Sequence, residues 1–424
     1  MMYEKGIGFF LLVIIVTILF LITVLLVVTI CRRAYNARKY KKLDKQRDMH
    51  HQKLIRYLET EHVPERMEEL FARPKSIKWL AIENVLLELM DEEKYARKAK
   101  ELFQRLDYRT FYERKTNSNN IIRKASAIDK LGKMRSEPST GSLIPMLDVD
   151  NTEIIAVTAR SLGRIGTPEG LEAILTRMPR LLSLALVTRK TIETALKNFG
   201  MTSITTLIEF GDKYIDPGPK ASILEVLSNM GARESLPFAA ANLDHADAEV
   251  RSKALKVIGA VGTELPEPVK KKVLARLDDT VWFVRLQAAK ALGNLKYEKA
   301  EDALAVRLLD ENWQVRNAAA MALTMLSDKA LDIFLGILES TDEYAKESIC
   351  EEIEKTNYVD RLIGNMDSLD LAIYHKSRNI LMIMCSLNYS SPLTEYLKTG
   401  ANERIKKKLE LLVHEEPASC GHLR

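Results

Sequence analysis

The pattern of hydrophobic and polar positions divides the chain into two parts. From Ile7 to Ile30 every residue is apolar except Gly8 and three threonines, a run of 24 residues. As a helix with a rise of about 1.5 Å per residue, this run spans roughly 36 Å, more than the roughly 30 Å hydrocarbon core of a bilayer. Beyond residue 63 the apolar residues recur at helical spacing instead. The pattern predicts one transmembrane helix, residues 7–31, followed by a series of amphipathic helices.

A cleavable signal peptide is the alternative interpretation of the apolar run. Such a peptide has a shorter apolar stretch, cations before it and small residues at a cleavage site after it. Here the cations follow the run and no A-x-A pattern appears, which favours a retained span. Because Lys and Arg beside a span stay in the cytoplasm, we expect residues 1–6 outside the cell membrane and the C-terminal bulk of the protein in the cytoplasm.

A strongly basic segment follows the predicted span. Between Arg32 and Arg56 ten cations oppose two carboxylates, giving +8, whereas residues 57–424 sum to −3 of the total charge of +5. The segment orients the span and also offers a surface for anionic lipid headgroups. Its periodicity predicts a helical stalk over residues 32–63, with a weak coiled-coil seam as the alternative. The membrane-proximal cations are Arg32, Arg33, Arg38, Lys39, Lys41 and Lys42.

A repeated motif covers most of the remaining chain. The segments from Val250, Val284 and Val315 each place an arginine seven positions before a Leu or Ile that a small residue follows. Each begins an amphipathic helix that another helix precedes, so the repeating unit is a helical hairpin whose stacking supplies the core. The same position recurs at intervals of 28 to 34 residues, at 124, 155, 189, 220, 251, 285, 316, 346, 376 and 404.

The recurring residues suggest structural roles. Small residues such as Ala288 let neighbouring helices approach closely, and an arginine at a helix start can reach an acidic turn such as Asp279 or Asp310, forming a ladder along the array. Trp282 and Trp313 both lie three residues before the repeated arginine. Because they share one structural position, we expect them to pack in the core rather than to form an aromatic binding pair.

The predicted fold class is all-α, an α-solenoid preceded by one N-terminal transmembrane helix. Residues 64–119 are expected to form atypical N-terminal capping helices, with a helix at Ile77–Leu89 and a longer loop at Tyr108–Asn120. The solenoid then covers residues 120–414, and residues 415–424 form a C-terminal tail.

The pattern D-x-x-x-x-V-R-x-x-A-A-x-A-L-G, from Asp279 to Gly293, resembles a HEAT repeat. Its period of roughly 31 residues is similar to the short variety named after phycobilisome lyases rather than to the common length of about 40 to 47. The resemblance implies that the second helix of each hairpin lines a concave, partner-binding face. The residues expected there form a basic stripe beside a methionine patch, which suits an acidic, partly apolar protein segment, or else an ordinary solvated face: Arg160, Arg164, Lys190, Lys253, Lys256, Lys290, Ala318, Met321, Met325, Glu347, Glu351 and Lys355.

Catalytic and metal-binding interpretations find little support in the sequence. Arrays resembling deoxyhypusine hydroxylase need several His-Glu pairs to hold iron, and only His414-Glu415 occurs. No Cys-His arrangement supports lyase chemistry on a bilin, and the near-neutral large domain argues against nucleic-acid binding. His414, Cys420 and His422 are the remaining candidate metal donors. The histidines at 50, 51 and 62 are expected to be exposed, Cys31 is a conceivable acylation site, and Cys350 and Cys385 are expected in the core.

The sequence therefore predicts a non-catalytic scaffold or adaptor that binds a membrane-associated protein at the cytoplasmic face of the membrane. It predicts no catalytic residue, cofactor, metal, nucleic acid or small-molecule substrate. The alternatives are a lyase-like enzyme, an accessory subunit of a membrane enzyme such as a glycosyltransferase, and a homotypic lattice former.

Overall fold

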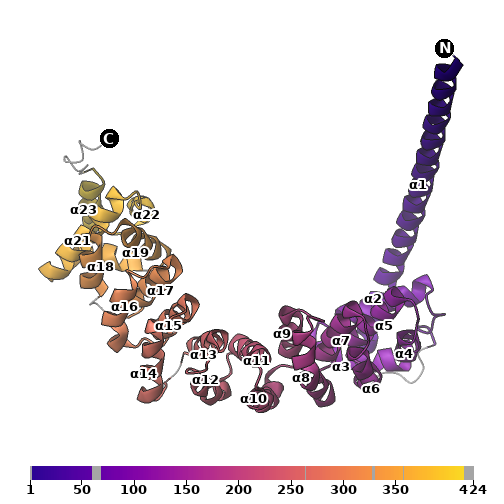
Figure 1. Cartoon of the computed structure of the whole chain (residues 1–424), viewed down its shortest axis with the longest axis horizontal. Coiled ribbons are helices and arrows are strands. Elements are labelled where there is room, and N and C mark those ends of the chain that lie inside the picture. The colour runs from indigo at the N-terminus through magenta and orange to yellow at the C-terminus, as the bar shows by residue number, and fades with distance from the viewer. Residues whose placement is uncertain (1, 60–67, 263, 327–329, 357, 415–424) are drawn as a thin grey trace. The chain divides into compact units, whose positions relative to one another are not determined.

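The computed structural model describes residues 2–59, 68–262, 264–326, 330–356 and 358–414, with side chains from Val16 to Leu412. The described residues contain helices and no strand, and the all-α prediction is confirmed. The chain divides into two compact units, Met1–Gly170 and Leu171–Arg424. Figure 1 shows short helices stacked side by side in each unit.

The first unit begins with a single long helix, α1 (Met2–Glu59). Its last turns pack against α2 with Leu54 and Leu58 fully buried, so the end of the predicted stalk belongs to the core of this unit. Shorter helices then stack in order, α5 against α7 among them. Their bounds are α2 (Ile77–Leu89), α3 (Glu93–Arg105), α4 (Tyr108–Thr116), α5 (Ile121–Lys133), α6 (Thr140–Leu143) and α7 (Thr152–Ile165), with 3-10 turns at Glu137–Ser139 and Ile144–Leu147.

The loop predicted at Tyr108–Asn120 is wrong, because Tyr108–Thr116 forms helix α4. Tyr108 and Tyr112 lie one turn apart on the same face, and both rings contact the indole of Trp79 on α2. The Tyr112 hydroxyl donates to the buried carboxylate of Glu83, 2.5 Å away. Lys130 on α5 lies 3.2 Å from the other oxygen of that carboxylate. An aromatic cluster and a buried polar network therefore hold this segment as a helix.

The second unit is a series of helical hairpins. Figure 1 shows α11, α13, α15, α17 and α19 along one side, with α10, α12, α14, α16 and α18 along the other. Successive helices from α9 through α11, α13, α15 and α17 to α19 contact one another, and we call them the inner row. The bounds are α8 (Pro168–Ser183), α9 (Arg189–Lys197), α10 (Ile204–Lys213), α11 (Pro217–Met230), α12 (Leu236–Ala241), α13 (Ala248–Val261), α14 (Glu267–Ala275), α15 (Trp282–Asn294), α16 (Glu301–Arg307), α17 (Trp313–Thr324), α18 (Ala330–Leu338), α19 (Glu343–Lys355), α20 (Tyr358–Gly364), α21 (Leu371–Ser386), α22 (Ser391–Thr399) and α23 (Glu403–His414).

The ten predicted repeat positions all fall near the start of a helix. In seven of them, in α5, α7, α11, α13, α15, α17 and α19, the repeated position is the fourth residue of the helix. Side chains cap several of these helices: Asp247 accepts from the amides of Glu249 and Val250, and Asn312 accepts from Gln314. The repeat seen in the sequence therefore corresponds to the helical hairpin that repeats in the structure.

The small residue eight positions after the repeated arginine is required by close helix packing. A Cβ atom on Gly293 of α15 would lie 2.8 Å from Cα of Ala322 on α17. A Cβ on Gly132 of α5 would lie 2.6 Å from Ser161 on α7. The two helices of each pair thus approach backbone to backbone at this point of the repeat.

Candidate interaction surfaces

A ladder of buried ion pairs joins consecutive hairpins of the second unit. The guanidinium of Arg251 donates through Nε and Nη2 to both oxygens of Asp279, at 2.8 Å each. Arg285 donates to both oxygens of Asp310 in the same way, also at 2.8 Å. Burial alone would raise the pKa of both carboxyl groups, but the hydrogen bonds from the arginines and from backbone amides outweigh it and lower the pKa of each. The predicted ladder is present in these two repeats.

Two of the lysines predicted to form a basic stripe are paired with a carboxylate of the neighbouring helix. Lys253 and Lys256 on α13 lie 2.9 and 2.5 Å from the two oxygens of Glu225 on α11. Burial alone would raise the pKa of Glu225, but its hydrogen bonds with Lys256 and Lys253 lower it to about 2. Burial and the charge of Glu225 together raise the pKa of Glu193 on α9. This part of the inner row is a network of mixed charge rather than a cationic surface.

Other residues expected on the same face differ in exposure. Lys190 and Lys290 are exposed, Met321 is half-buried and Met325 is exposed. Ala318, expected to face a partner, is instead buried in the packing of α17. Farther along, Glu351 pairs with Lys355 and accepts from Asn317 on α17. The accessible residues of this surface therefore include Lys190, Lys290 and Met325, with Met321 half-buried.

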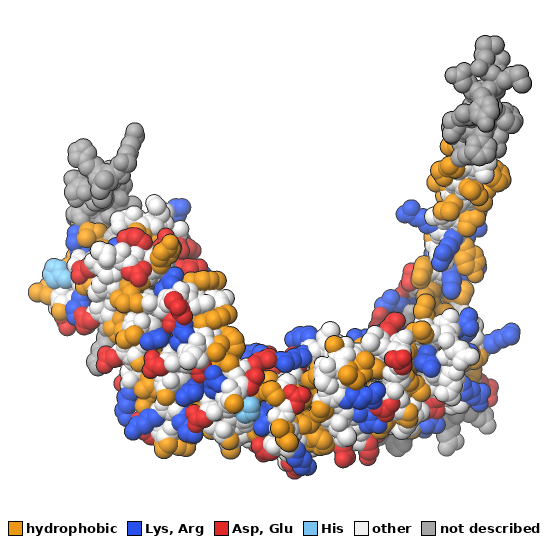
Figure 2. All heavy atoms as spheres, in the orientation of Figure 1, with side chains coloured by type: hydrophobic (Ala, Val, Ile, Leu, Met, Phe, Trp, Pro, Cys, Tyr) orange, Lys and Arg blue, Asp and Glu red, His pale blue; other side chains and the backbone are white. Residues whose placement is uncertain are grey.

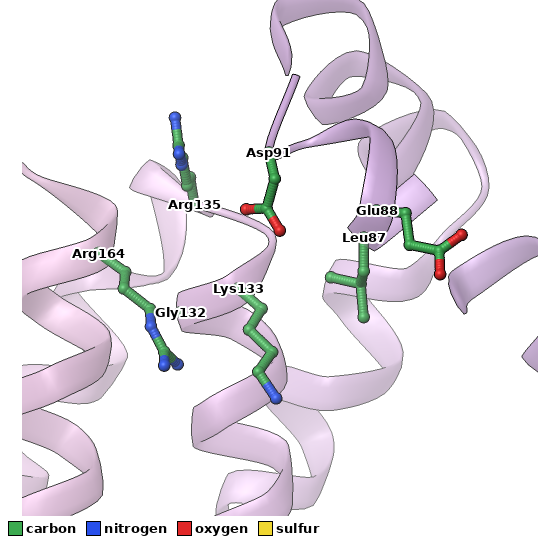
Figure 3. A pocket seen from close by; sticks show the side chains of 7 residues that line it. All are labelled: Leu87, Glu88, Asp91, Gly132, Lys133, Arg135 and Arg164. Atoms are coloured by element: carbon green, nitrogen blue, oxygen red, sulfur yellow. The ribbon is translucent and has the colours of Figure 1, made fainter. Parts of the chain in front are cut away.

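In the first unit the predicted cations Arg160 and Arg164 lie on α7, and both are exposed. Arg164 shares the carboxylate of Asp129 with Lys133, at 2.8 and 2.7 Å. Both basic side chains line an open pocket of about 380 Å³ between the end of α2 and helices α5 and α7. In Figure 3 Arg135, which also lines it, points the opposite way from Lys133 and Arg164. Because these cations do not converge on one point, the pocket is not preorganised to bind an anion.

The expectation that Trp282 and Trp313 pack in the core is wrong. Trp282 is 39% exposed and Trp313 is 60% exposed. Tyr344 follows at the same interval of 31 residues near the start of α19 and is 71% exposed. Three consecutive inner helices therefore each begin with an accessible aromatic ring, a row that extends the predicted set of surface residues.

The apolar run of α1 packs against nothing in the described part of the chain. Its large side chains from Val16 to Ile30 are between 43% and 70% exposed, and α1 is the one described helix long and apolar enough to cross a membrane. The six predicted membrane-proximal cations, from Arg32 to Lys42, are also exposed. Figure 2 shows hydrophobic side chains on the described upper part of α1, Lys and Arg side chains below them, and both charge signs interspersed over the two units.

The expectation that His50 is exposed is wrong. His50 is only 3% exposed where α1 meets α2, and neither ring nitrogen has a hydrogen-bond partner among the described residues. Burial lowers its pKa first, and the charges of Lys78 on α2 and Lys53 on α1 lower it further. His51 is half-buried, and His62 lies outside the described residues.

The cysteines and the candidate metal donors take different positions. Cys350 is buried, Cys385 is half-buried and Cys31 is exposed. Cys420, His422 and the side chain of His414 lie outside the described residues. Within the described part of the chain no group of three His, Cys, Asp or Glu residues is arranged to hold a metal ion.

Comparison with known proteins supports the assignment of the repeats. A family model described as HEAT repeats matches residues 269–354, the segment that carries the Arg285–Asp310 pair and the helices from α14 to α19. The chain contains HEAT repeats. Comparison with curated proteins found no match to this chain.

Several solved structures resemble the HEAT-repeat fold of this chain at low sequence identity. Kap121p matches at 14% identity with a TM-score of 0.41, over 81% of this chain and 46% of its own. The complex of CpcE and CpcF of phycocyanin lyase from Nostoc sp. matches at 18% identity with a TM-score of 0.29, over 57% and 94%. Human deoxyhypusine hydroxylase in complex with glycerol matches at 18% identity with a TM-score of 0.26, over 66% and 95%.

Proposed function

We propose that the protein is a membrane-anchored, non-catalytic scaffold whose HEAT repeats bind a membrane-associated protein at the cytoplasmic face of the cell membrane. The observation that carries this proposal is the exposed apolar run of α1, joined through an exposed basic segment to a stack of helical repeats. Leaving some 15 consecutive residues of this kind in water is unfavourable, whereas a bilayer accommodates them. The cations that follow favour a cytoplasmic location for everything C-terminal to them.

The repeats supply the binding role in this proposal. Stacked hairpins present a long surface on which each repeat contributes a few side chains, and such surfaces suit extended protein segments. Lys190, Lys290, Met321 and Met325 represent the predicted partner face in the second unit, and Arg160 and Arg164 represent it in the first unit. The anchor confines the search for a partner to the membrane plane, so a modest affinity is sufficient for occupancy.

Alkaline extraction of membranes tests the anchor. We expect the full-length chain to stay in the membrane pellet. The double substitution L19R/I22R places two cations near the centre of the span at a cost of about 2.5 to 3.5 kcal/mol each, and we expect it to shift the chain to the supernatant. L19A/I22A is the matched control and stays in the pellet. Release of the unchanged protein by alkali contradicts the anchor.

Protease treatment tests the orientation. With an epitope at the C-terminus of the full chain, we expect the epitope to survive protease in intact cells and to be lost once the cells are opened. Substitution of the six cations from Arg32 to Lys42 by glutamine removes the orienting charge, and we expect part of the population to invert. Digestion of the epitope in intact cells contradicts the cytoplasmic location.

A further inference from the structure

Three consecutive repeats hold an arginine in the same orientation at the start of their inner helices. Nη1 of Arg251, Arg285 and Arg316 donates to the carbonyl oxygen of the residue six positions earlier, at 2.8, 3.0 and 2.9 Å respectively. This shared contact fixes the plane of each guanidinium against the turn before its helix. The free edge of the guanidinium, Nε with Nη2, is thereby directed toward the turn of the next repeat.

In the first two repeats an aspartate of that next turn fills the free edge. Arg251 binds Asp279 and Arg285 binds Asp310, each through two parallel hydrogen bonds of 2.8 Å. Two parallel N–H donors match the two oxygens of a carboxylate, a geometry that gives strong and directional pairing. The repeat is therefore built to hold a carboxylate at this edge.

The third repeat lacks this carboxylate. Asp279, Asp310 and Ser340 occupy one structural position, because each accepts from the backbone amide two residues later, at 3.1, 3.0 and 3.3 Å. The hydroxyl of Ser340 donates to the carbonyl of Ile337. Nε of Arg316 is buried and has no acceptor among the described residues, and no ion pair to this arginine is found there.

No carboxylate of the described residues pairs with the guanidinium of Arg316. The ring of Tyr344 lies 5.7 Å from the guanidinium, a cation–π distance, and Trp313 lies one turn earlier on α17. Both rings are exposed. The nearby carboxylates of Glu311 and Glu343 are engaged by Arg285 and Lys346, at 3.2 and 2.9 Å. The chain thus offers a positioned guanidinium flanked by two accessible aromatic rings.

We infer that Arg316, with Trp313 and Tyr344, is a binding site for the carboxylate of an acidic side chain on a protein partner. This inference rests on the scaffold function proposed above and names the chemistry of the segment that the scaffold holds. The partner's carboxylate pairs with this guanidinium as Asp279 and Asp310 pair with theirs in the preceding repeats, and Nε, which is buried in the free protein, becomes accessible when the two-bond pair forms. Apolar atoms beside that carboxylate pack on the two rings.

Photo-crosslinking in cells tests the site. The full-length tagged chain carries benzoylphenylalanine in place of Trp313, and captured proteins are identified together with the crosslinked segment. The test variants are R316Q, which removes the charged edge, and S340D, which supplies the missing carboxylate from the chain itself. S340N is the matched control, since it has the shape of aspartate without the charge. Thermal unfolding of each purified variant in detergent accompanies the capture.

The expected result is a captured segment that contains Asp or Glu beside the crosslink. Capture falls about tenfold or more in R316Q and S340D but not in S340N, as the loss of a charge-assisted pair predicts. S340D also melts at a higher temperature than S340N, which shows that the edge was open and excludes unfolding as the cause of lost capture.

Three results overturn the inference. Capture that persists in R316Q and S340D moves the binding surface elsewhere and leaves the scaffold function standing. A crosslinked segment without a carboxylate does the same. Equal melting temperatures for S340D and S340N show that Arg316 cannot pair with a carboxylate in the way that Arg251 and Arg285 do. Absence of any captured protein, from this position and from a second crosslinker at Lys290, contradicts the scaffold function itself.

Discussion

Gly293 offers the sharpest test of how the repeats are packed. It lies in α15, eight positions after Arg285, where α15 meets α17. A Cβ atom there would lie 2.8 Å from Cα and 2.9 Å from Cβ of Ala322. Because the nearer of these atoms belongs to the backbone, no side-chain rotation relieves the contact. The substitution G293A therefore forces α15 and α17 apart.

Two opposing contributions set the magnitude of the effect. Replacing a glycine by alanine inside a helix ordinarily stabilises it by about 0.5 to 1 kcal/mol. Inserting a methyl group into a closely packed interface costs about 1 to 3 kcal/mol. We therefore expect G293A to lower the free energy of unfolding by up to roughly 2.5 kcal/mol, whereas the helix preference alone would raise it.

Denaturant unfolding of the full chain in detergent, followed by circular dichroism, measures this change. Gly336 in α18 is the matched control, since a Cβ there would meet nothing within 4 Å, and G336A should stabilise by about 0.5 to 1 kcal/mol. Adding A322G to G293A removes one of the two short contacts and should recover part of the loss. If G293A is as stable as G336A, the close approach of α15 and α17 is wrong.

Three further predictions concern buried charges. The substitution D310N leaves the Arg285 guanidinium without its main partner in a buried site, and should cost about 3 to 5 kcal/mol in denaturant unfolding. The lowered pKa of Glu225 stabilises the fold fully above about pH 4.5, and this contribution should be lost as the pH falls toward about 2, a loss that E225Q lacks. Because the pKa of His50 is below its ordinary 6.5, protonation opposes the packing of α1 on α2. The protection factors of amides in α2, which correct for the pH dependence of intrinsic hydrogen exchange, should fall below about pH 6.5 in the unchanged chain and not in H50L.

Each of these predictions has a control within the chain. Asp278 is 78% exposed and pairs with Arg307 at 3.3 Å, so D278N should cost at most about 1 kcal/mol; an equal cost for D310N refutes the argument from burial. An acid transition that E225Q shares with the unchanged chain shows that other carboxylates govern it. If the protection of α2 amides from hydrogen exchange depends on pH in the same way in H50L, protonation of His50 is not the cause.

Much of the repeat architecture follows from the sequence because it depends on local periodicity. The ten repeat positions lie near helix starts because a hairpin of nearly constant length returns the same residue to the same place. The pairing of Arg251 with Asp279 was predictable for the same reason, since a repeated arginine faces a repeated acidic turn. The small residue at Gly293 marks where neighbouring helices touch.

The features that the sequence did not reveal depend on contacts between different elements. Trp282 and Trp313 each lie three residues before a repeated arginine, so the sequence shows that they occupy equivalent positions. It does not show whether another helix covers them, and in the structure both rings remain exposed. Helix α4 exists because its tyrosines meet Trp79 on α2, a partner that local composition does not indicate. Likewise, Glu225 neutralises lysines on the next helix, so the stripe looked more basic in sequence than it is in space.

Recovery of a bound partner from cells tests whether the protein is a scaffold. The tagged full-length chain is crosslinked in cells, purified from the membrane fraction, and the recovered proteins are quantified against it, with K290E as a variant of the accessible inner face. We expect one different, membrane-associated protein in near-stoichiometric amount, with less of it recovered in K290E. Recovery of the chain alone, or only of further copies of it, would contradict the scaffold function and favour self-assembly.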